Sequence, residues 1–223
     1  MTNTQFGFKM SLPSSPKQFG CSVDFTGATG ITSIAGTSSG KWSTTGNIVA
    51  FYLDSGGVLR YVECSLTYFS SGGTQSQGWY FWEGYNGGAG NYHPLAVDPT
   101  GDSITLQLLY NTSSNQWSAT YTDHTHATGL TYTISGTANV TSNGIAGCHV
   151  MFENGGNTTC SNYGSFGGLT FSNITYYDSS GNAISFTSTA GSSLVTQNLP
   201  NQCPGSLPCL NQDYSNIKIT RNC

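Results

Sequence analysis

The sequence predicts an all-β protein folded as a two-sheet antiparallel β-sandwich, and three observations support this prediction. Apolar and polar residues alternate along many short segments, which is the period of a strand with one buried face. Clusters of Gly, Asn, Ser and Asp separate these segments, as expected for turns. No stretch combines the 3.6-residue period of an amphipathic helix with capping residues. Many short strands joined by turns are typical of a sandwich.

Each predicted strand places apolar or aromatic residues at alternate positions. In chain order, the predicted strands are residues 47–53, 58–67, 79–82, 103–110, 117–123, 131–135, 148–152, 169–177 and 183–187. The turn signals between them are residues 54–57, 70–73, 86–90, 111–115, 154–157 and 178–182. Two-sheet sandwiches reach this length as one unit, so we expect a single domain over residues 1–223. We expect residues 1–20 and 199–223 to be irregular segments that wrap the sandwich.

Charged residues are rare in this chain. They make up 7% of the 223 residues, against roughly 25% in an ordinary soluble domain. The polar surface must therefore come from Ser, Thr, Asn, Gln and Gly, and its charge changes little with pH. Such a surface suits a protein exposed to acid, where paired carboxylates would be protonated and lose their stabilising effect. A neutral surface for adhesion or for carrying glycans explains the composition equally well.

The charge pattern and the apolar pattern exclude several partners. The net charge is −4 and the six Lys and Arg residues are scattered singly, so there is no basic stripe for nucleic acid. No apolar run is long enough to span a bilayer, and the first ten residues lack the apolar region of a signal peptide. We interpret Met1 as the start of an expressed mature form or of a segment left after processing. We expect a monomer without a membrane or nucleic-acid partner.

Seven cysteines indicate an oxidising compartment, and hence a secreted protein. Spacing suggests three disulfides without determining their connectivity: Cys148 with Cys160, Cys203 with Cys209, and Cys21 with Cys223. Cys64 would then remain a free, buried thiol. His124 and His126 alternate at a strand end, but we find no carboxylate or cysteine companion for a metal. We therefore expect neither a metal nor a cofactor.

The chain has only three glutamates, and each lies in or beside an apolar or aromatic strand: Glu63, Glu83 and Glu153. A carboxyl group on a strand that faces a groove is partly desolvated, which raises its pKa. Two such groups close together share a proton and act as one acid–base unit. This unit can split a peptide bond with an activated water molecule. The alternative is that these are ordinary carboxylates at the rim of the sandwich.

Several segments, in the same order and at similar spacing, resemble the eqolisins, which are glutamic peptidases of fungi and some acid-loving prokaryotes. Residues 150–153 (VMFE) resemble the strand that carries the family's catalytic glutamate, which implies that Glu153 is catalytic. The other similar segments are residues 27–42, 51–54 (FYLD), 101–105 (GDSIT), 110–120 (YNTSSNQWSAT) and 164–171 (GSFGGLTF). The resemblance covers roughly residues 27–177 and implies a concanavalin-like jelly roll.

One departure from the family concerns the second catalytic position. The eqolisins pair their glutamate with a glutamine, but no Gln occurs between Phe51 and Gly73. Alternation along residues 58–67 directs Val62, Cys64 and Leu66 into the core. Tyr61, Glu63, Ser65 and Thr67 should then face the groove. Glu63 would take the glutamine position, and a Glu–Glu pair resembles the plant neprosins. If Cys64 holds the position instead, the catalytic pair is broken.

The aromatic segment 79–85 (WYFWEGY) is similar to a "WYEWYP" segment of the family. Under the functional interpretation, Trp79 and Trp82 form the floor of a substrate groove and Glu83 supports the catalytic pair. The alternative is a sandwich strand with aromatic residues on both faces. The resemblance also implies that Asp54 supports the site. The alternative is that Asp54 simply begins the turn at residues 54–57.

The resulting hypothesis is a secreted endopeptidase that acts on protein or peptide substrates at acid pH and is insensitive to pepstatin. Ionised Glu153 would be the general base that activates water, and protonated Glu63 would donate a hydrogen bond to the developing oxyanion. Tyr61 would line the groove. The alternative function is a non-catalytic extracellular sandwich that binds glycans or mediates adhesion, for which aromatic strands and abundant Asn and Asp are also suitable.

Overall fold

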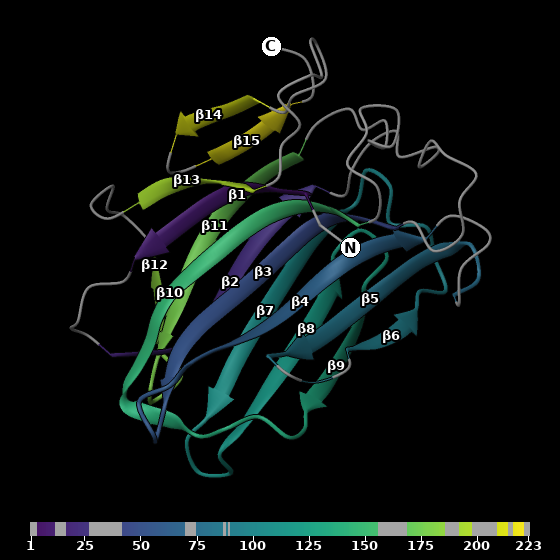
Figure 1. The fold of residues 1–223 in the computed structure, drawn as a ribbon. Helices are drawn as coiled ribbons and strands as arrows, with labels where there is room; N and C mark the ends of the chain where they lie inside the picture. Colours follow the sequence, from purple (N-terminus) through teal and green to yellow (C-terminus); the bar gives the residue numbers. More distant parts are fainter. Residues whose placement is uncertain are drawn as a thin grey trace.

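The structure is a computed structural model that describes residues 4–11, 17–26, 42–69, 75–86, 88, 90–155, 169–185, 192–197, 209–213 and 216–220. These residues form two stacked antiparallel sheets (Figure 1), which confirms the predicted β-sandwich. Within the same ranges, no helix is long and apolar enough to cross a bilayer.

The first sheet has seven strands in the order β13-β1-β10-β3-β4-β5-β6. Their bounds are Ser192–Gln197 (β13), Thr4–Ser11 (β1), Val140–Gly155 (β10), Trp42–Asp54 (β3), Leu59–Phe69 (β4), Gly78–Tyr85 (β5) and Asn91–Pro94 (β6). The second sheet has the order β14-β15-β11-β2-β7-β8-β9, and β12 pairs with β11. Their bounds are Cys209–Asp213 (β14), Asn216–Thr220 (β15), Leu169–Asp178 (β11), Gln18–Thr26 (β2), Ser103–Asn111 (β7), Gln116–Asp123 (β8), Thr128–Ile134 (β9) and Ala183–Ser185 (β12).

The hydrophobic core lies between the two sheets and follows directly from alternation. In β7, Ile104, Leu106 and Leu108 are fully buried, whereas Thr105 and Gln107 between them are half-buried on the other face. Trp117 of β8 and many other side chains complete this layer. Burying an aliphatic or aromatic side chain of this size contributes about 1.5–3 kcal/mol to folding.

The two ends of the chain differ from the prediction of irregular segments. Residues 1–20 contain β1 and the start of β2. Residues 199–223 likewise contain β14 and β15. The short edge strand β6 and the strand β13 are also absent from the predicted set. The Pro-rich stretch 199–208 lies outside the described residues.

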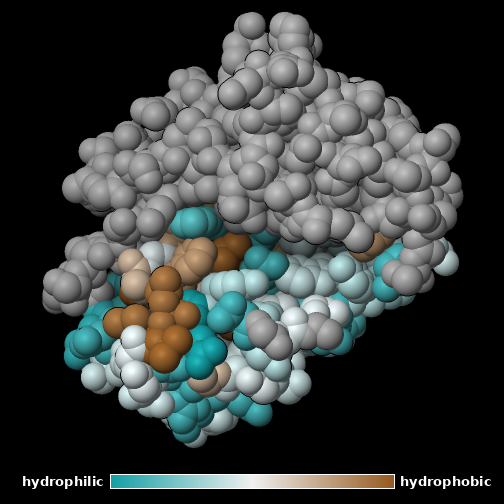
Figure 2. Space-filling model, viewed as in Figure 1, coloured by the Kyte–Doolittle hydropathy of each residue, from teal (hydrophilic) through white to brown (hydrophobic). Residues whose placement is uncertain are grey.

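The β3–β4 hairpin projects from one end of the first sheet and carries exposed apolar side chains. Leu53, Val58 and Leu59 are 37%, 50% and 57% exposed. Figure 2 shows an apolar patch at the lower left, where this hairpin lies in Figure 1.

Candidate active site

The outer face of the seven-stranded sheet carries the polar side chains that the sequence assigned to the groove. In β4, Val62, Cys64 and Leu66 are fully buried and belong to the core. Since successive side chains of a strand lie on opposite faces, the residues between them lie on the outer face. The predicted alternation of β4 is therefore confirmed.

The strand register arranges this outer face in rows that cross β10, β3 and β4. The first row is His149, Val49 and Glu63. The second row is Met151, Asn47 and Ser65. The third row is Glu153, Thr44 and Thr67. An irregularity in β3 between Thr44 and Gly46 separates the second row from the third.

Glu63 and Glu153 therefore stand in different rows. Glu63 aligns with His149 through Val49, whereas Glu153 aligns with Thr67 through Thr44. Four residues along the strands and two strand spacings across the sheet correspond to about 16 Å between the two Cα atoms, at roughly 3.3 Å per residue and about 4.8 Å per strand. The register does not set the glutamates opposite each other, and a shared proton between them stays a prediction.

Three small polar side chains are buried in the second and third rows. Asn47, Ser65 and Thr67 are 1%, 2% and 3% exposed. The hydroxyl groups of Ser65 and Thr67 lie 2.8 Å apart and form a hydrogen bond. Buried polar groups are costly unless they are hydrogen-bonded, and this bond fixes the hydroxyl groups of Ser65 and Thr67 in position. This polar strip lies one and two strands away from the position of Glu153.

Aromatic rings flank the polar strip on β5 and β6. Trp82 packs 6.3 Å from Tyr92, and Tyr80 packs against Phe69 at 5.4 Å, as ring centroid distances. Trp79, in contrast, is part of the core. Strand β5 thus has aromatic residues on both faces, as expected if it is an ordinary strand of the sandwich. Of the aromatic residues of β5, Tyr80 and Trp82 lie on the candidate site's face.

Glu83 lies on the opposite side of the sheet from the polar strip. It pairs with Cys64 across the strands, on the core face, and is 2% exposed. Asn91 donates a hydrogen bond to Glu83 Oε1 at 2.6 Å, and His93 Nε2 lies 3.4 Å from the same oxygen. His93 stacks on Tyr132 of the other sheet at 3.5 Å. In this position Glu83 holds two side chains of β6, one of which, His93, contacts the other sheet, and Glu83 does not lie on the outer face.

Asp54 has a structural role in the turn that follows β3. Its Oδ1 accepts the backbone N–H groups of Gly56 and Val58, and its Oδ2 accepts a bond from Arg60 Nε at 2.9 Å. The Val58 N–H and the Arg60 guanidinium lower the pKa of Asp54. Tyr61 is half-buried on the outer face, with its ring 6.1 Å from that of Phe51.

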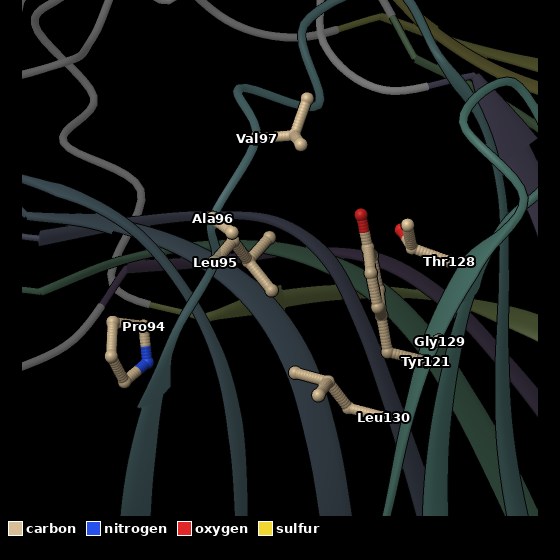
Figure 3. Close-up of a pocket in the computed structure, with 8 residues that line it drawn as sticks. All are labelled: Pro94, Leu95, Ala96, Val97, Tyr121, Thr128, Gly129 and Leu130. Atoms are coloured by element: carbon tan, nitrogen blue, oxygen red, sulfur yellow. The ribbon is translucent and has the colours of Figure 1, made fainter.

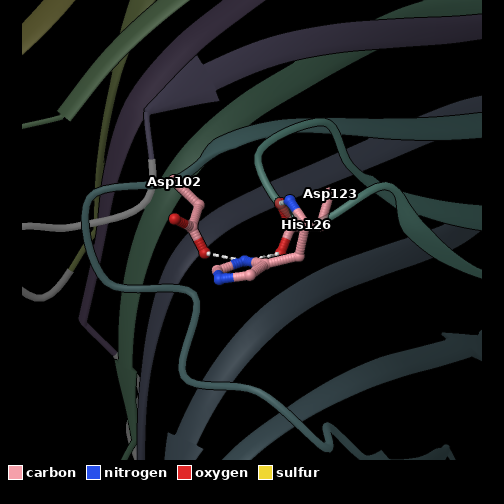
Figure 4. A group of neighbouring side chains, drawn as sticks. All are labelled: Asp102, Asp123 and His126. Carbon is pink, nitrogen blue, oxygen red and sulfur yellow. Dashed lines mark hydrogen bonds and ion pairs between the residues drawn. The ribbon is translucent and has the colours of Figure 1, made fainter.

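A second cluster of ionisable groups lies at the end of β8, and sequence reasoning missed it (Figure 4). His126 Nδ1 lies 3.0 Å from Oδ2 of both Asp102 and Asp123. The hydrogen bond to Asp123 raises the pKa of His126, and Asp102 adds to this effect. Burial raises the pKa of Asp102, with a further contribution from Asp123. Although burial opposes it, hydrogen bonds from His126 and Thr125 lower the pKa of Asp123.

Asp102, Asp123 and His126 could also hold a cation. Each offers one possible ligand atom, a carboxylate oxygen or an imidazole nitrogen, and these atoms lie within 4.8 Å of each other. A divalent cation would use the atoms that now bind one another. Asp123 was visible in the sequence, three residues before His126. Asp102 reaches the cluster only because β7 pairs with β8, so its proximity is a tertiary feature.

An apolar pocket of about 140 Å³ opens close to this cluster (Figure 3). It lies between the segment after β6, including Leu95 and Val97, and the strands β8 and β9. Tyr121 lines it and carries the one aromatic hydroxyl in the pocket wall. No carboxylate lines the pocket, which therefore suits an apolar group better than hydrolytic chemistry.

The predicted cysteine pairings require a correction. Cys21, Cys64 and Cys148 are free and fully buried, which confirms the expectation for Cys64. The side chains of Cys148 and Cys21 both enter the core, where their sulfurs lie 3.3 Å apart. Cys160, Cys203 and Cys223 lie outside the described residues. Of Cys209, only the backbone pairing with Thr220 is described.

The architecture is similar to a known fold, the β-sandwich of the eqolisin peptidases. No protein-family model matches the sequence, and no curated protein matches it significantly. Solved structures do match. The chain is similar to scytalido-glutamic peptidase, solved with a peptide-based transition-state analogue, with a TM-score of 0.62 and 11% identity over 98% of each chain.

A second similar structure is SCP-B, a member of the eqolisin family solved in a complex with the tripeptide Ala-Ile-His. The TM-score is 0.60 and the identity 12%, over 99% of this chain and 98% of that chain. At such identities the likeness shows a shared fold and a remote resemblance. It extends over both sheets, including the strands near the chain ends that the resemblance in sequence did not reach.

Proposed function

We propose that this protein is an endopeptidase that binds an extended peptide across the outer face of its seven-stranded sheet. The observation that carries the proposal is the fold match over 98% of both chains with a glutamic peptidase that binds a peptide-based transition-state analogue. The buried polar strip beside β10 supports it, because it supplies fixed hydrogen-bonding groups on the same face.

In this proposal Glu153 is the general base. A peptidase without a metal or a covalent nucleophile needs a carboxylate that takes a proton from water as the water attacks the scissile carbonyl. The same carboxyl group can then give the proton to the leaving amine. Glu153 lies in the central strand β10 and in the same row as Thr67, so its position on the sheet is next to the polar strip.

We assign stabilisation of the oxyanion to Asn47. The side-chain amide of Asn47 can donate N–H groups, and it lies in the strand adjacent to Glu153, one row away. A buried, preorganised donor of this kind is worth roughly 10²–10³ in kcat. Glu63 stands about 13 Å further along the strands at roughly 3.3 Å per residue. We therefore assign Glu63 a role in binding the substrate and not in stabilising the reacting carbonyl.

In this proposal the protein acts at acid pH because substrate binding needs protonated Glu63. Protonated Glu63 can donate a hydrogen bond to a substrate carbonyl, whereas ionised Glu63 cannot. The rate should therefore rise with pH as Glu153 ionises, and KM should rise once Glu63 ionises. Secretion and action as a monomer belong to the same proposal.

The test is digestion of unfolded casein between pH 2 and pH 7 by the wild type, Glu153→Gln, Asn47→Ala and Glu63→Gln, in the presence of pepstatin. We expect Glu153→Gln to lose kcat by more than about 10³-fold and Asn47→Ala by about 10²-fold. Glu63→Gln should retain kcat, because Gln still donates an N–H, and should lose the increase of KM toward neutral pH.

Near-UV circular dichroism of each variant controls for folding. If folded Glu153→Gln keeps the wild-type kcat, the assignment of the base is wrong. If Glu63→Gln is as inactive as Glu153→Gln, the two glutamates act as one unit and the separate roles are wrong. A folded wild type that cleaves nothing at any pH would favour a binding or adhesion protein.

A further inference from the structure

Two buried thiols meet at the centre of the sandwich. Cys21 lies in β2 of the eight-stranded sheet, and Cys148 lies in β10 of the seven-stranded sheet. Both side chains are 0% exposed. The Cys148 thiol donates a hydrogen bond to Cys21 Sγ, and the two sulfurs are 3.3 Å apart. The two central layers of the fold thus contact each other through a pair of cysteines.

The remaining gap to a covalent bond is small. A disulfide has a sulfur–sulfur distance of about 2.05 Å, so the two atoms need to approach by only about 1.2 Å. The two residues are 127 positions apart in the chain. A bond between them would close a very long loop, and such loops give the largest entropic stabilisation in the chain-entropy description.

We propose that Cys21 and Cys148 form an inter-sheet disulfide when the protein folds in an oxidising environment. The two thiols lose two protons and two electrons, and a small-molecule disulfide such as oxidised glutathione accepts them and becomes two thiols. One sulfur–sulfur bond forms inside the core. Cys64 remains a thiol, because it is fully buried and the other two free cysteines of the described residues are already joined to each other.

The bond should form during folding, before the sheets close. Exchange proceeds through the thiolate, and burial, with a further contribution from Cys148, raises the pKa of Cys21 well above its ordinary value. Both sulfurs are also inaccessible in the folded protein. The folded, reduced protein should therefore resist oxidation, whereas the refolding chain should be oxidised.

This bond excludes two of the three pairings suggested by spacing, Cys148 with Cys160 and Cys21 with Cys223, and leaves Cys203 with Cys209 possible. A sulfur joined to Cys21 or Cys148 cannot also bind Cys160 or Cys223. Peptide mapping therefore distinguishes the alternatives without any substitution.

The experiment starts with the full chain, refolded with a mixture of oxidised and reduced glutathione. Remaining thiols are alkylated in denaturant, and the protein is digested and analysed by mass spectrometry without reduction. We expect a crosslinked pair of peptides that contains Cys21 and Cys148, with Cys64 alkylated. Recovery of Cys21 and Cys148 as alkylated thiols, or crosslinked to other cysteines, would overturn the proposal.

Thermal unfolding with and without reductant gives a second readout. Reduction should lower the Tm of the wild type by about 10 °C, from the typical stabilisation by a long-loop disulfide and the usual Tm response of a chain this size. Cys21→Ala and Cys148→Ala should lose this difference. Cys64→Ala is the matched control, since Cys64 is equally buried and should keep the full reductant effect.

Discussion

Several carboxylates among the described residues accept backbone N–H groups of nearby turns. Asp123 accepts the N–H groups of Thr125 and His126, and Asp178 accepts those of Ser180 and Asn182. Such bonds favour the ionised form and lower the carboxyl pKa. With so few basic residues available, turns take over the role that salt bridges have in more highly charged proteins.

His126 is the residue whose protonation should affect stability near neutral pH. Its pKa is raised from an ordinary 6.5 by the hydrogen bond to Asp123 and by Asp102. A raised pKa means that its stabilising effect is fully present below pH 6.5 and is lost as the pH rises through the raised value. We expect His126→Gln to lower Tm relative to the wild type at pH 5.5, and to lower it much less at pH 9.

Differential scanning fluorimetry between pH 4.5 and pH 9.5 measures this effect. Asp123→Asn provides the control, because it removes the charge that holds the imidazolium and should weaken the pH dependence as well. A Tm difference between His126→Gln and the wild type that stays constant over this range would show that His126 does not act through its charge.

At the level of single residues, the sequence predicts what depends on local alternation. The burial of Val62, Cys64 and Leu66 follows from a period of two and matches the prediction. The contact between Asp102 and His126 could not be predicted, because it depends on which strands become neighbours. For the same reason, two glutamates that both lie on plausible strands are four residues out of register.

Among the elements, the strands with strict alternation were predicted, whereas β1 and β2, with eight and nine residues, and the short peripheral strands were missed. β7 and β8 carry strict alternation over eight or nine residues. β6 has only four residues and ends in a proline, and β14 and β15 have five residues each. Such short strands do not build a recognisable period and exist because a neighbouring strand offers a free edge.

The long strand β10 depends on a glycine near its start. Gly144 has φ of +73°, and a Cβ atom there would lie 2.2 Å from the backbone oxygen of Gln18. We expect Gly144→Ala to destabilise the protein by well over 2 kcal/mol, since left-handed strain alone costs about 1–2 kcal/mol and the clash with a main-chain atom adds to it.

Gly181→Ala is the matched control, because Gly181 has φ of +81° but a Cβ atom added there would have no neighbouring atom within 4 Å. It should show only the strain of about 1 kcal/mol. Urea unfolding of both variants measures the two costs. Equal losses of stability would mean that the backbone of β10 and of the start of β2 can shift to accommodate a methyl group without further cost.

The whole molecule combines a large apolar core with a nearly neutral surface, and this combination should resist acid. At low pH the chain carries only about ten positive charges from Lys, Arg and His, so self-repulsion is weak. Asp54, Asp123 and Asp178 have lowered pKa values, so their stabilising effect persists until the pH falls through those values.

We therefore expect the near-UV circular dichroism signal to persist at pH 3, with a lower Tm than at pH 6, and the loss of Tm to be concentrated below pH 4. Loss of the tertiary signal at pH 5 would contradict this expectation. It would point instead to a fold that depends strongly on ion pairs such as Arg60–Asp54.

The edge strand β6 has a consequence for association between copies of the protein. A sheet that ends in a long, regular strand presents a row of free N–H and C=O groups on which another chain can add a strand. β6 offers only Asn91–Pro94, and Pro94 has no N–H to donate. At this border the first sheet provides almost no template on which another copy of the chain could add a strand.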